Sequence, residues 1–152
     1  MHLKLFLVVL HIALAALWFG APLMIGSVLK KSAATGQAGF AAGAGVADRM
    51  ALLGGVGSAG ALLTGLALIF SVYGGMKGLP VPFHIALTLV LLGVVLSFGF
   101  IKPTTSKLVA AAAAADYKPA TAASSIKKMS MFSGISQLLW LISLVCMYAA
   151  QM

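Results

Sequence analysis

Four stretches of about 20 residues without a charged side chain decide what this chain can fold into, because each can cross a hydrocarbon core of about 30 Å as a helix. The composition agrees, since 62% of the 152 residues are hydrophobic and only 8% are charged. A soluble fold of this size could not cover so much apolar surface. The sequence therefore predicts an all-α integral membrane four-helix bundle, with residues 1–152 forming a single transmembrane domain in a lipid bilayer.

The helix boundaries are expected at charged and turn-forming residues. Asp48 is expected to cap the start of the second helix, and the Gly-, Ala- and Ser-rich stretch 30–47 before it is expected to form a loop. Pro80 and Pro82 suit the opening turn of the third helix. The four predicted helices, in up-down-up-down order, cover about residues 3–29, 49–73, 81–101 and 129–150.

The connection after the third helix is polar and rich in alanine. Lys102 and Pro103 are expected to end the third helix. A short helical stretch is expected around residues 108–115, followed by a break at Pro119. The fourth predicted helix then starts about ten residues after that break.

The basic residues are unevenly divided between the two ends of the predicted bundle. Only Lys4 and Lys77 lie at the end that carries both termini. The positive-inside rule therefore places the opposite end in the cytoplasm and both termini outside it, in a multi-pass protein. The eight basic residues of the opposite end are Lys30, Lys31, Arg49, Lys102, Lys107, Lys118, Lys127 and Lys128.

Two histidines lie within the predicted spans, where an ionisable side chain is costly and indicates a functional site. His11 and His84 are expected roughly 12 and 6 Å below the outer ends of the first and third helices. These helices are diagonal in an up-down-up-down bundle, so the two imidazoles could face each other and fill both axial positions of a b-type haem. Taken singly, each histidine is equally explained by a hydrogen bond to a neighbouring helix, and His84 by contact with headgroups.

A stripe of small residues follows one face of the second helix and includes Gly54 and Gly57. Such a stripe indicates close packing, either against another helix, including that of a second copy in a homodimer, or against a flat cofactor. Trp18 lies seven residues after His11, on the same helix face, where it would pack against a haem edge or fill the core.

Three further side chains are candidates for contacts with a haem. Lys77 is expected at the outer end, where it could pair with the haem propionates. Met76 and Met147 are also expected toward the outer side, and either could replace one histidine as a thioether ligand. Methionine is nevertheless more often a packing residue.

The sequence offers too few suitable residues for several other functions. The only carboxylates are Asp48 and Asp116, both expected at helix ends or in loops, so no carboxylate pair is available for acid–base catalysis. Cys146 stands alone, and the predicted spans hold too few ligands for a zinc or di-iron site. The basic residues accompany no nucleic-acid motif.

The segment LHIALAALWFGAPL resembles the first helix of a group of small bacterial membrane proteins that includes HemJ-type protoporphyrinogen oxidases and the copper-resistance D domain. The resemblance rests on Leu10, His11, Trp18 and Gly20. It implies location in the bacterial inner membrane and a haem b ligated by His11. HemJ-type proteins use a lysine early in the third helix, whereas this chain has His84 there, which speaks against oxidase activity and leaves haem binding intact.

The leading hypothesis is therefore a haem b protein with His11 and His84 as axial ligands. Two filled axial positions favour electron transfer, or haem or redox sensing, over catalysis. A quinone or another membrane redox partner would then exchange electrons with it. The alternatives are a HemJ-like porphyrinogen oxidase and a copper-handling membrane protein without haem.

Overall fold

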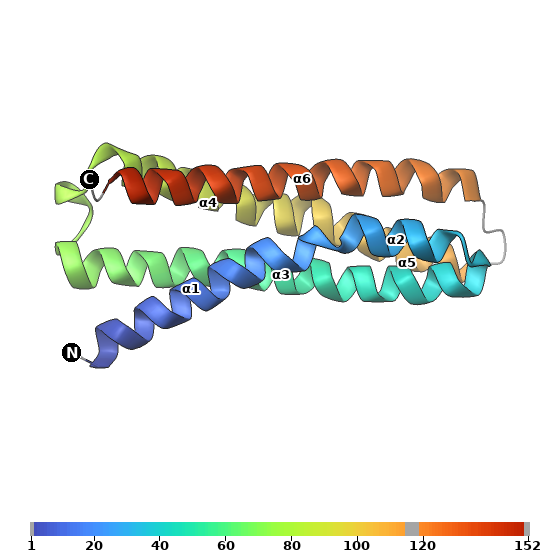
Figure 1. The fold of residues 1–152 in the computed structure, drawn as a ribbon, viewed down its shortest axis with the longest axis horizontal. Helices are drawn as coiled ribbons and strands as arrows, with labels where there is room; N and C mark the ends of the chain where they lie inside the picture. Colours follow the sequence, from blue (N-terminus) through green and yellow to red (C-terminus); the bar gives the residue numbers. More distant parts are fainter. Residues whose placement is uncertain (1, 115–118, 151–152) are drawn as a thin grey trace.

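The computed structural model describes residues 2–114 and 119–150 as an all-α four-helix membrane bundle without strands in those ranges (Figure 1). Four helical stretches are long and apolar enough to span a membrane, namely Leu3–Ala33, Gly36–Tyr73, Val81–Ala113 and Ala122–Ala149. The elements are α1 (His2–Leu23), α2 (Ile25–Ala33), α3 (Gly36–Tyr73), η1 (Met76–Gly78), α4 (Val81–Leu96), η2 (Ser97–Ile101), α5 (Lys102–Ala113) and α6 (Pro119–Ala149).

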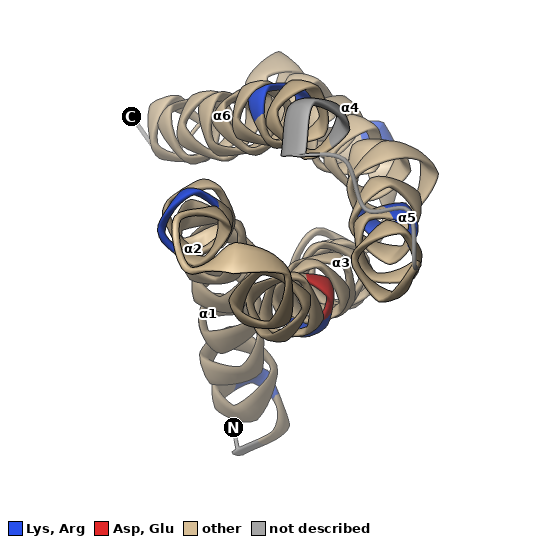
Figure 2. Ribbon diagram, turned by 90° about the vertical axis from the view of Figure 1, so that its right-hand side faces the viewer, with Lys and Arg blue, Asp and Glu red and all other residues tan. Residues whose placement is uncertain are grey.

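The spans alternate in direction, as predicted. Both ends of the chain and the α3–α4 connection lie at one end of the bundle, which we call the terminal end (Figure 1). We call the opposite end, which carries Lys30, Lys31, Lys107, Lys127 and Lys128, the basic end. Seen end-on, the helices form a ring in which α1 and α4 have no direct backbone contact, which confirms their diagonal placement (Figure 2).

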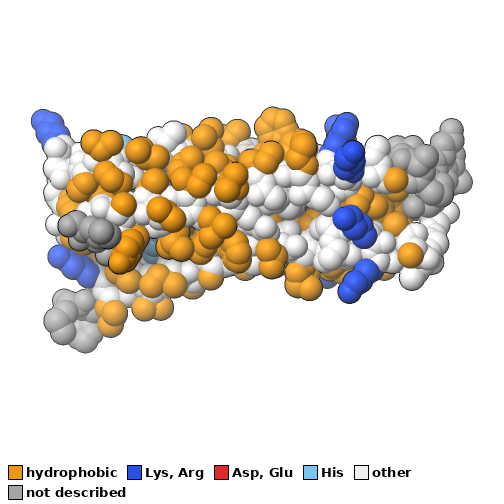
Figure 3. Space-filling view, turned by 45° about the horizontal axis from the view of Figure 1, so that its top comes forward, with side chains coloured by type: hydrophobic (Ala, Val, Ile, Leu, Met, Phe, Trp, Pro, Cys, Tyr) orange, Lys and Arg blue, Asp and Glu red, His pale blue; other side chains and the backbone are white. Residues whose placement is uncertain are grey.

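The polar and apolar surfaces are segregated along the bundle. On the face drawn in Figure 3, hydrophobic side chains are spread over the length between two groups of Lys and Arg, one in a band toward one end and one at the opposite extreme. Helices of 28–38 residues measure about 42–57 Å at 1.5 Å per residue, which exceeds a hydrocarbon core of about 30 Å. The spans are therefore longer than the hydrocarbon core requires.

The expected loop at 30–47 is wrong, because α2 extends to Ala33 and α3 begins at Gly36. Along this part of α3, Phe40, Ala44 and Ala47 are fully buried in the main hydrophobic core. Small residues let the neighbouring helices approach, and this packing outweighs the low helix propensity of the glycines. The other members of that core are Ile25, Leu29, Ala51, Ile101, Leu108, Ala112, Ala122, Ile126 and Met129.

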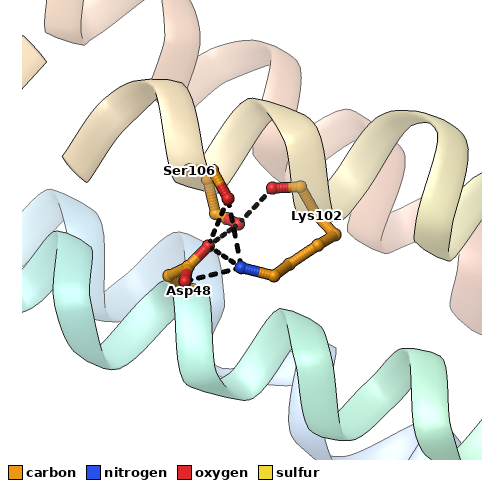
Figure 4. A network of polar contacts seen from close by, with 4 residues as sticks. Asp48, Lys102 and Ser106 are labelled. Atoms are coloured by element: carbon orange, nitrogen blue, oxygen red, sulfur yellow. Dashed lines mark hydrogen bonds and ion pairs between the residues drawn. The ribbon is translucent and has the colours of Figure 1, made fainter. Parts of the chain in front are cut away.

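Asp48 is not an N-cap, since it lies inside α3 and faces α5 (Figure 4). Lys102 Nζ is 2.6 Å from both carboxylate oxygens of Asp48. The hydroxyls of Thr105 and Ser106 each lie 2.9 Å from Asp48 Oδ1. Asp48 is the only carboxylate in the described ranges, and it is neutralised within the bundle by this network.

Lys102 and Pro103 do not end the third span. A five-residue π-helix, Ser97–Ile101, continues α4 directly into α5. Pro103 lies at the start of α5, directly after the π-helix, and its missing N–H removes one backbone hydrogen bond from this continuous helical stretch. The helix expected around residues 108–115 is confirmed as far as Ala113.

The fourth span begins earlier than expected, because Pro119 opens α6. Proline at the first position of a helix is compatible with its fixed φ. Asp116 and Lys118, two of the charged residues used in the sequence analysis, lie outside the described residues.

The first span bends between α1 and α2, next to Pro22. Proline removes one backbone hydrogen bond of the preceding turn, which is the usual cause of such a kink. Toward its N-terminus α1 leans away from α6, as both views show (Figures 1 and 2). The bundle is consequently opened in its terminal half.

Candidate cofactor site around His11

Two adjoining cavities occupy the terminal half of the bundle. Their volumes are about 300 and 540 Å³, within the range of about 300–1,000 Å³ typical of small-molecule sites. Apolar side chains supply most of both walls. The residues that line both cavities are His11, Ala61, Val90 and Met147.

His11 is held against α3 by hydrogen bonding to Thr64 and to the backbone of Ala61. Its Nδ1 lies 3.0 Å from Thr64 Oγ1. Gly65, on the next position of α3, leaves room for the ring, because a Cβ there would lie 3.2 Å from His11 Cε1. A glycine and a threonine on one helix thus set both the position and the orientation of the imidazole.

The same threonine determines the histidine tautomer. Thr64 has a single hydroxyl proton, and its Oγ1 lies 2.6 Å from the carbonyl oxygen of Gly60, to which it donates. Thr64 Oγ1 also lies 3.3 Å from the Ala61 carbonyl oxygen, so its proton goes to a backbone carbonyl in either case. We therefore assign the contact with His11 as Nδ1–H donating to Thr64 Oγ1. In this tautomer His11 Nε2 carries the unshared electron pair of the ring. A histidine anchored through one nitrogen and open at the other has the arrangement of a metal ligand.

The structure does not bring His84 to His11. The side chain of His84 is exposed and lines neither cavity. The inward face of α4 is formed by Phe83, Leu87 and Val90, spaced as one side of a helix. His84 follows Phe83 and is therefore turned about 100° from that face. The depth of His84 along its helix, which the sequence suggested, did not determine the direction in which its side chain points.

Met147, the alternative thioether, does reach the site. It lies on α6, is half-buried and lines both cavities together with His11. Met76 lies in η1 and lines neither. Of the three side chains considered as ligands beside Met76, His11 and Met147 therefore line the same cavities and His84 does not.

Trp18 forms one wall of the larger cavity and connects three helices. Its side chain is only 2% exposed, and its Nε1–H donates to Ser136 Oγ at 3.1 Å. Its ring lies so close to Gly93 of α4 that a Cβ at that position would overlap it. Contact with a cofactor and packing in the core were both possible for Trp18. Its side chain is packed in the core and also lines the larger cavity.

Gly54 and Gly57 are packed against α1, which excludes a flat cofactor from their surface. A Cβ on Gly57 would lie 2.5 Å from the backbone nitrogen of Trp18, and one on Gly54 would lie 2.8 Å from Pro22 Cγ. The helix–helix interpretation of this small-residue stripe is confirmed, and the expected cofactor contact at Gly54 and Gly57 is wrong.

Two tyrosines near the terminal end line the cavities, whereas the lysine expected to meet the haem propionates does not. Tyr73 lines the smaller cavity and Tyr148 the larger one, and both are exposed. Lys77 is exposed in η1 and lines neither cavity. The tyrosine hydroxyls are therefore better placed than Lys77 to meet polar groups of a ligand in these cavities.

Comparisons with protein-family models, with curated proteins and with solved structures find no match for this chain. The resemblance to HemJ-type and copper-resistance D proteins therefore stays a prediction from the first-helix motif.

Thr64 is the residue that the sequence analysis undervalued. It was visible only as a member of the small-residue stripe of α3. Its spacing from Gly60 and Gly65 indicated a close helix contact, but the partner in that contact could be identified only once α1 and α3 were placed together.

Proposed function

We propose that this chain is a b-type haem protein of the bacterial inner membrane, with His11 as an axial ligand, and that it serves electron transfer or haem or redox sensing. The observation that carries the proposal is the state of His11. Its Nδ1 is bound to Thr64, its Nε2 pair is available, and it stands in the common wall of two apolar cavities.

The residues present fit this group. Haem needs only one or two axial ligands from the protein and otherwise an apolar, water-poor enclosure. Across the described ranges, no three His, Cys, Asp or Glu side chains cluster as a metal site would require. The donor set at the cavity therefore favours a metal that brings most of its own ligands, as haem iron does.

Met147 is the better-supported second ligand. It shares both cavity linings with His11, whereas His84 points away from them. The original bis-histidine proposal thus becomes a His–Met proposal for this site. Histidine–methionine ligation is used by electron-transfer cytochromes and raises the reduction potential.

Bound haem would supply one-electron chemistry. The chain's own residues would hold it: His11 oriented by Thr64, Met147 from α6, and the apolar walls that exclude water. The described wall residues include no carboxylate to move a proton, which supports electron transfer or sensing over porphyrinogen oxidation. A quinone or another membrane redox protein is the partner class that suits this chemistry. The positive-inside rule would place the cavities toward the outer surface of the membrane.

Titration of ferric haem into the purified, haem-free protein in detergent tests the proposal. We expect a Soret band that saturates at one haem per chain, and its loss in His11→Ala. A matched variant, His84→Ala, should titrate as the wild type does. Absence of saturable binding in a folded wild-type protein would overturn the proposal, and tight binding of Cu(I) by that protein would then favour copper handling.

A further inference from the structure

A second, polar site lies on the opposite half of the molecule, between α2 and α6. We call it the α2–α6 groove and define it by Gly26, Lys30, Ser130, Ser133, Gly134 and Gln137. Its volume is about 260 Å³. A neighbouring hollow of about 350 Å³ adjoins the groove. Lys30 and Ser130 line both, and Lys127 lines the hollow alone. The groove shares no lining residue with the cavities around His11.

The groove contains hydrogen-bonding groups that the protein itself does not satisfy. Ser133 is 6% exposed, and its Oγ is buried without a partner. Ser130 Oγ is likewise buried without a partner, and it lies against the α2 backbone at Gly26. The third hydroxyl of this kind in the described residues, that of Ser97, lies outside the groove. Buried polar groups are normally paired, so two orphan hydroxyls on one groove wall indicate a missing acceptor.

The charge of the groove is also uncompensated. Lys30 and Lys127 make no ion pair among the described residues, whose single carboxylate, Asp48, is occupied by Lys102. The whole chain has ten basic and only two acidic residues. Within the described part of the chain, no carboxylate therefore neutralises Lys30 or Lys127.

We propose that the α2–α6 groove binds the phosphate of an anionic phospholipid headgroup. A phosphate oxygen accepts hydrogen bonds from hydroxyls and ammonium groups at the same time, which is the combination found here. Lys30, which lines the groove, belongs to the basic end. A band of Lys and Arg side chains borders the apolar surface (Figure 3), which is where headgroups are expected. Basic pockets between membrane helices are known to hold anionic headgroups on this principle.

Gly134 makes the groove testable without disturbing the core. A Cβ added to Gly134 meets nothing within 4 Å, so the position opens onto empty space. Gly134→Leu should fill the groove while leaving the helix contacts intact. Ser133→Ala removes an orphan hydroxyl and should leave the empty protein as stable as before, or more stable.

The test is native mass spectrometry of the full chain released from vesicles of phosphatidylcholine with phosphatidylglycerol. We expect phosphatidylglycerol to be retained, and its affinity to fall about fivefold in Lys30→Gln and in Ser133→Ala. Gly134→Leu should abolish retention. Lys107→Gln, which removes a lysine of the basic end outside the groove, is the matched control and should have no effect.

Three results would overturn the proposal. The first is equal retention of phosphatidylcholine, and the second is an equal loss in Lys107→Gln, which would indicate a diffuse charge effect. The third is full displacement of the lipid by millimolar inorganic phosphate, which would make free phosphate the ligand. Circular dichroism and thermal unfolding of each variant separate loss of binding from loss of fold.

Discussion

Thr64 Oγ1 accepts a hydrogen bond from His11 Nδ1 at 3.0 Å while its own proton is donated to the Gly60 carbonyl. This relationship fixes the imidazole and leaves Nε2 free. Thr64→Val keeps the shape of the side chain and removes the acceptor. We expect haem affinity to fall about 10- to 100-fold, the usual cost of losing a partner that orients a metal ligand. Haem titration measures it.

Thr64→Ser is the control for that experiment, because it retains the hydroxyl. Its affinity should stay within a few-fold of the wild type. If Thr64→Val bound haem as tightly as the wild type, the orienting role assigned to Thr64 would be wrong.

Trp18 is predicted to stabilise the bundle through Ser136. Trp18→Phe leaves the hydroxyl of Ser136, which is 1% exposed, without its donor. We expect a loss of about 1–3 kcal/mol from the unpaired group, in addition to the lost ring volume. Unfolding in a denaturing detergent measures the change. The double variant Trp18→Phe/Ser136→Ala should recover part of it, and strictly additive effects would refute the coupling.

Gly57 is predicted to be intolerant of any side chain. Its added Cβ would lie 2.5 Å from a backbone atom of α1, which cannot move aside as a flexible side chain can. Gly57→Ala should therefore separate α1 from α3 and destabilise the protein by about 1–3 kcal/mol. Gly45→Ala, on the same helix but facing open space, should instead stabilise by about 0.5–1 kcal/mol. The two melting temperatures should move in opposite directions, and a shift of the same sign would contradict the close approach.

The Asp48–Lys102 pair is predicted to act as a unit. Both side chains are about a quarter exposed, at 26% and 28%, so solvent screens part of the interaction. Lys102→Met leaves Asp48 as an uncompensated charge and should cost about 1.5–3 kcal/mol. Asp48→Asn/Lys102→Met removes both charges and should be more stable than the single variant. If the double-mutant cycle gave no coupling energy, Asp48 and Lys102 would not stabilise each other, and the prediction would be wrong.

Much of the fold was predictable because the apolar windows are long and uncharged. They determined the number, order and direction of the spans. The helix end expected at Lys102 and Pro103 and the break expected at Pro119 are wrong, because both prolines lie in opening turns of helices.

The loop expected at residues 30–47 is also wrong, although glycine, alanine and lysine normally indicate loops. There the burial of Phe40, Ala44 and Ala47 makes helix the preferred state, and such tertiary packing is not visible in local composition.

The site was predictable in part. His11 and Trp18 do line a cavity, because both lie on the α1 face that meets α3 and α6. His84 was assigned by depth alone, and one residue of rotation on α4 takes it out of the bundle. Gly54 and Gly57 show that a small-residue stripe does not reveal what packs against it. Only the observed position of α1 answers that question.

The most direct test of the proposed haem site is the reduced-minus-oxidised absorption spectrum of the protein, purified in detergent after expression with ample haem. The account predicts a low-spin b-type spectrum that is lost in His11→Ala, becomes high-spin in Met147→Leu and is unchanged in His84→Ala. A colourless wild-type protein, or an unaltered spectrum in His11→Ala, would contradict haem ligation at this site.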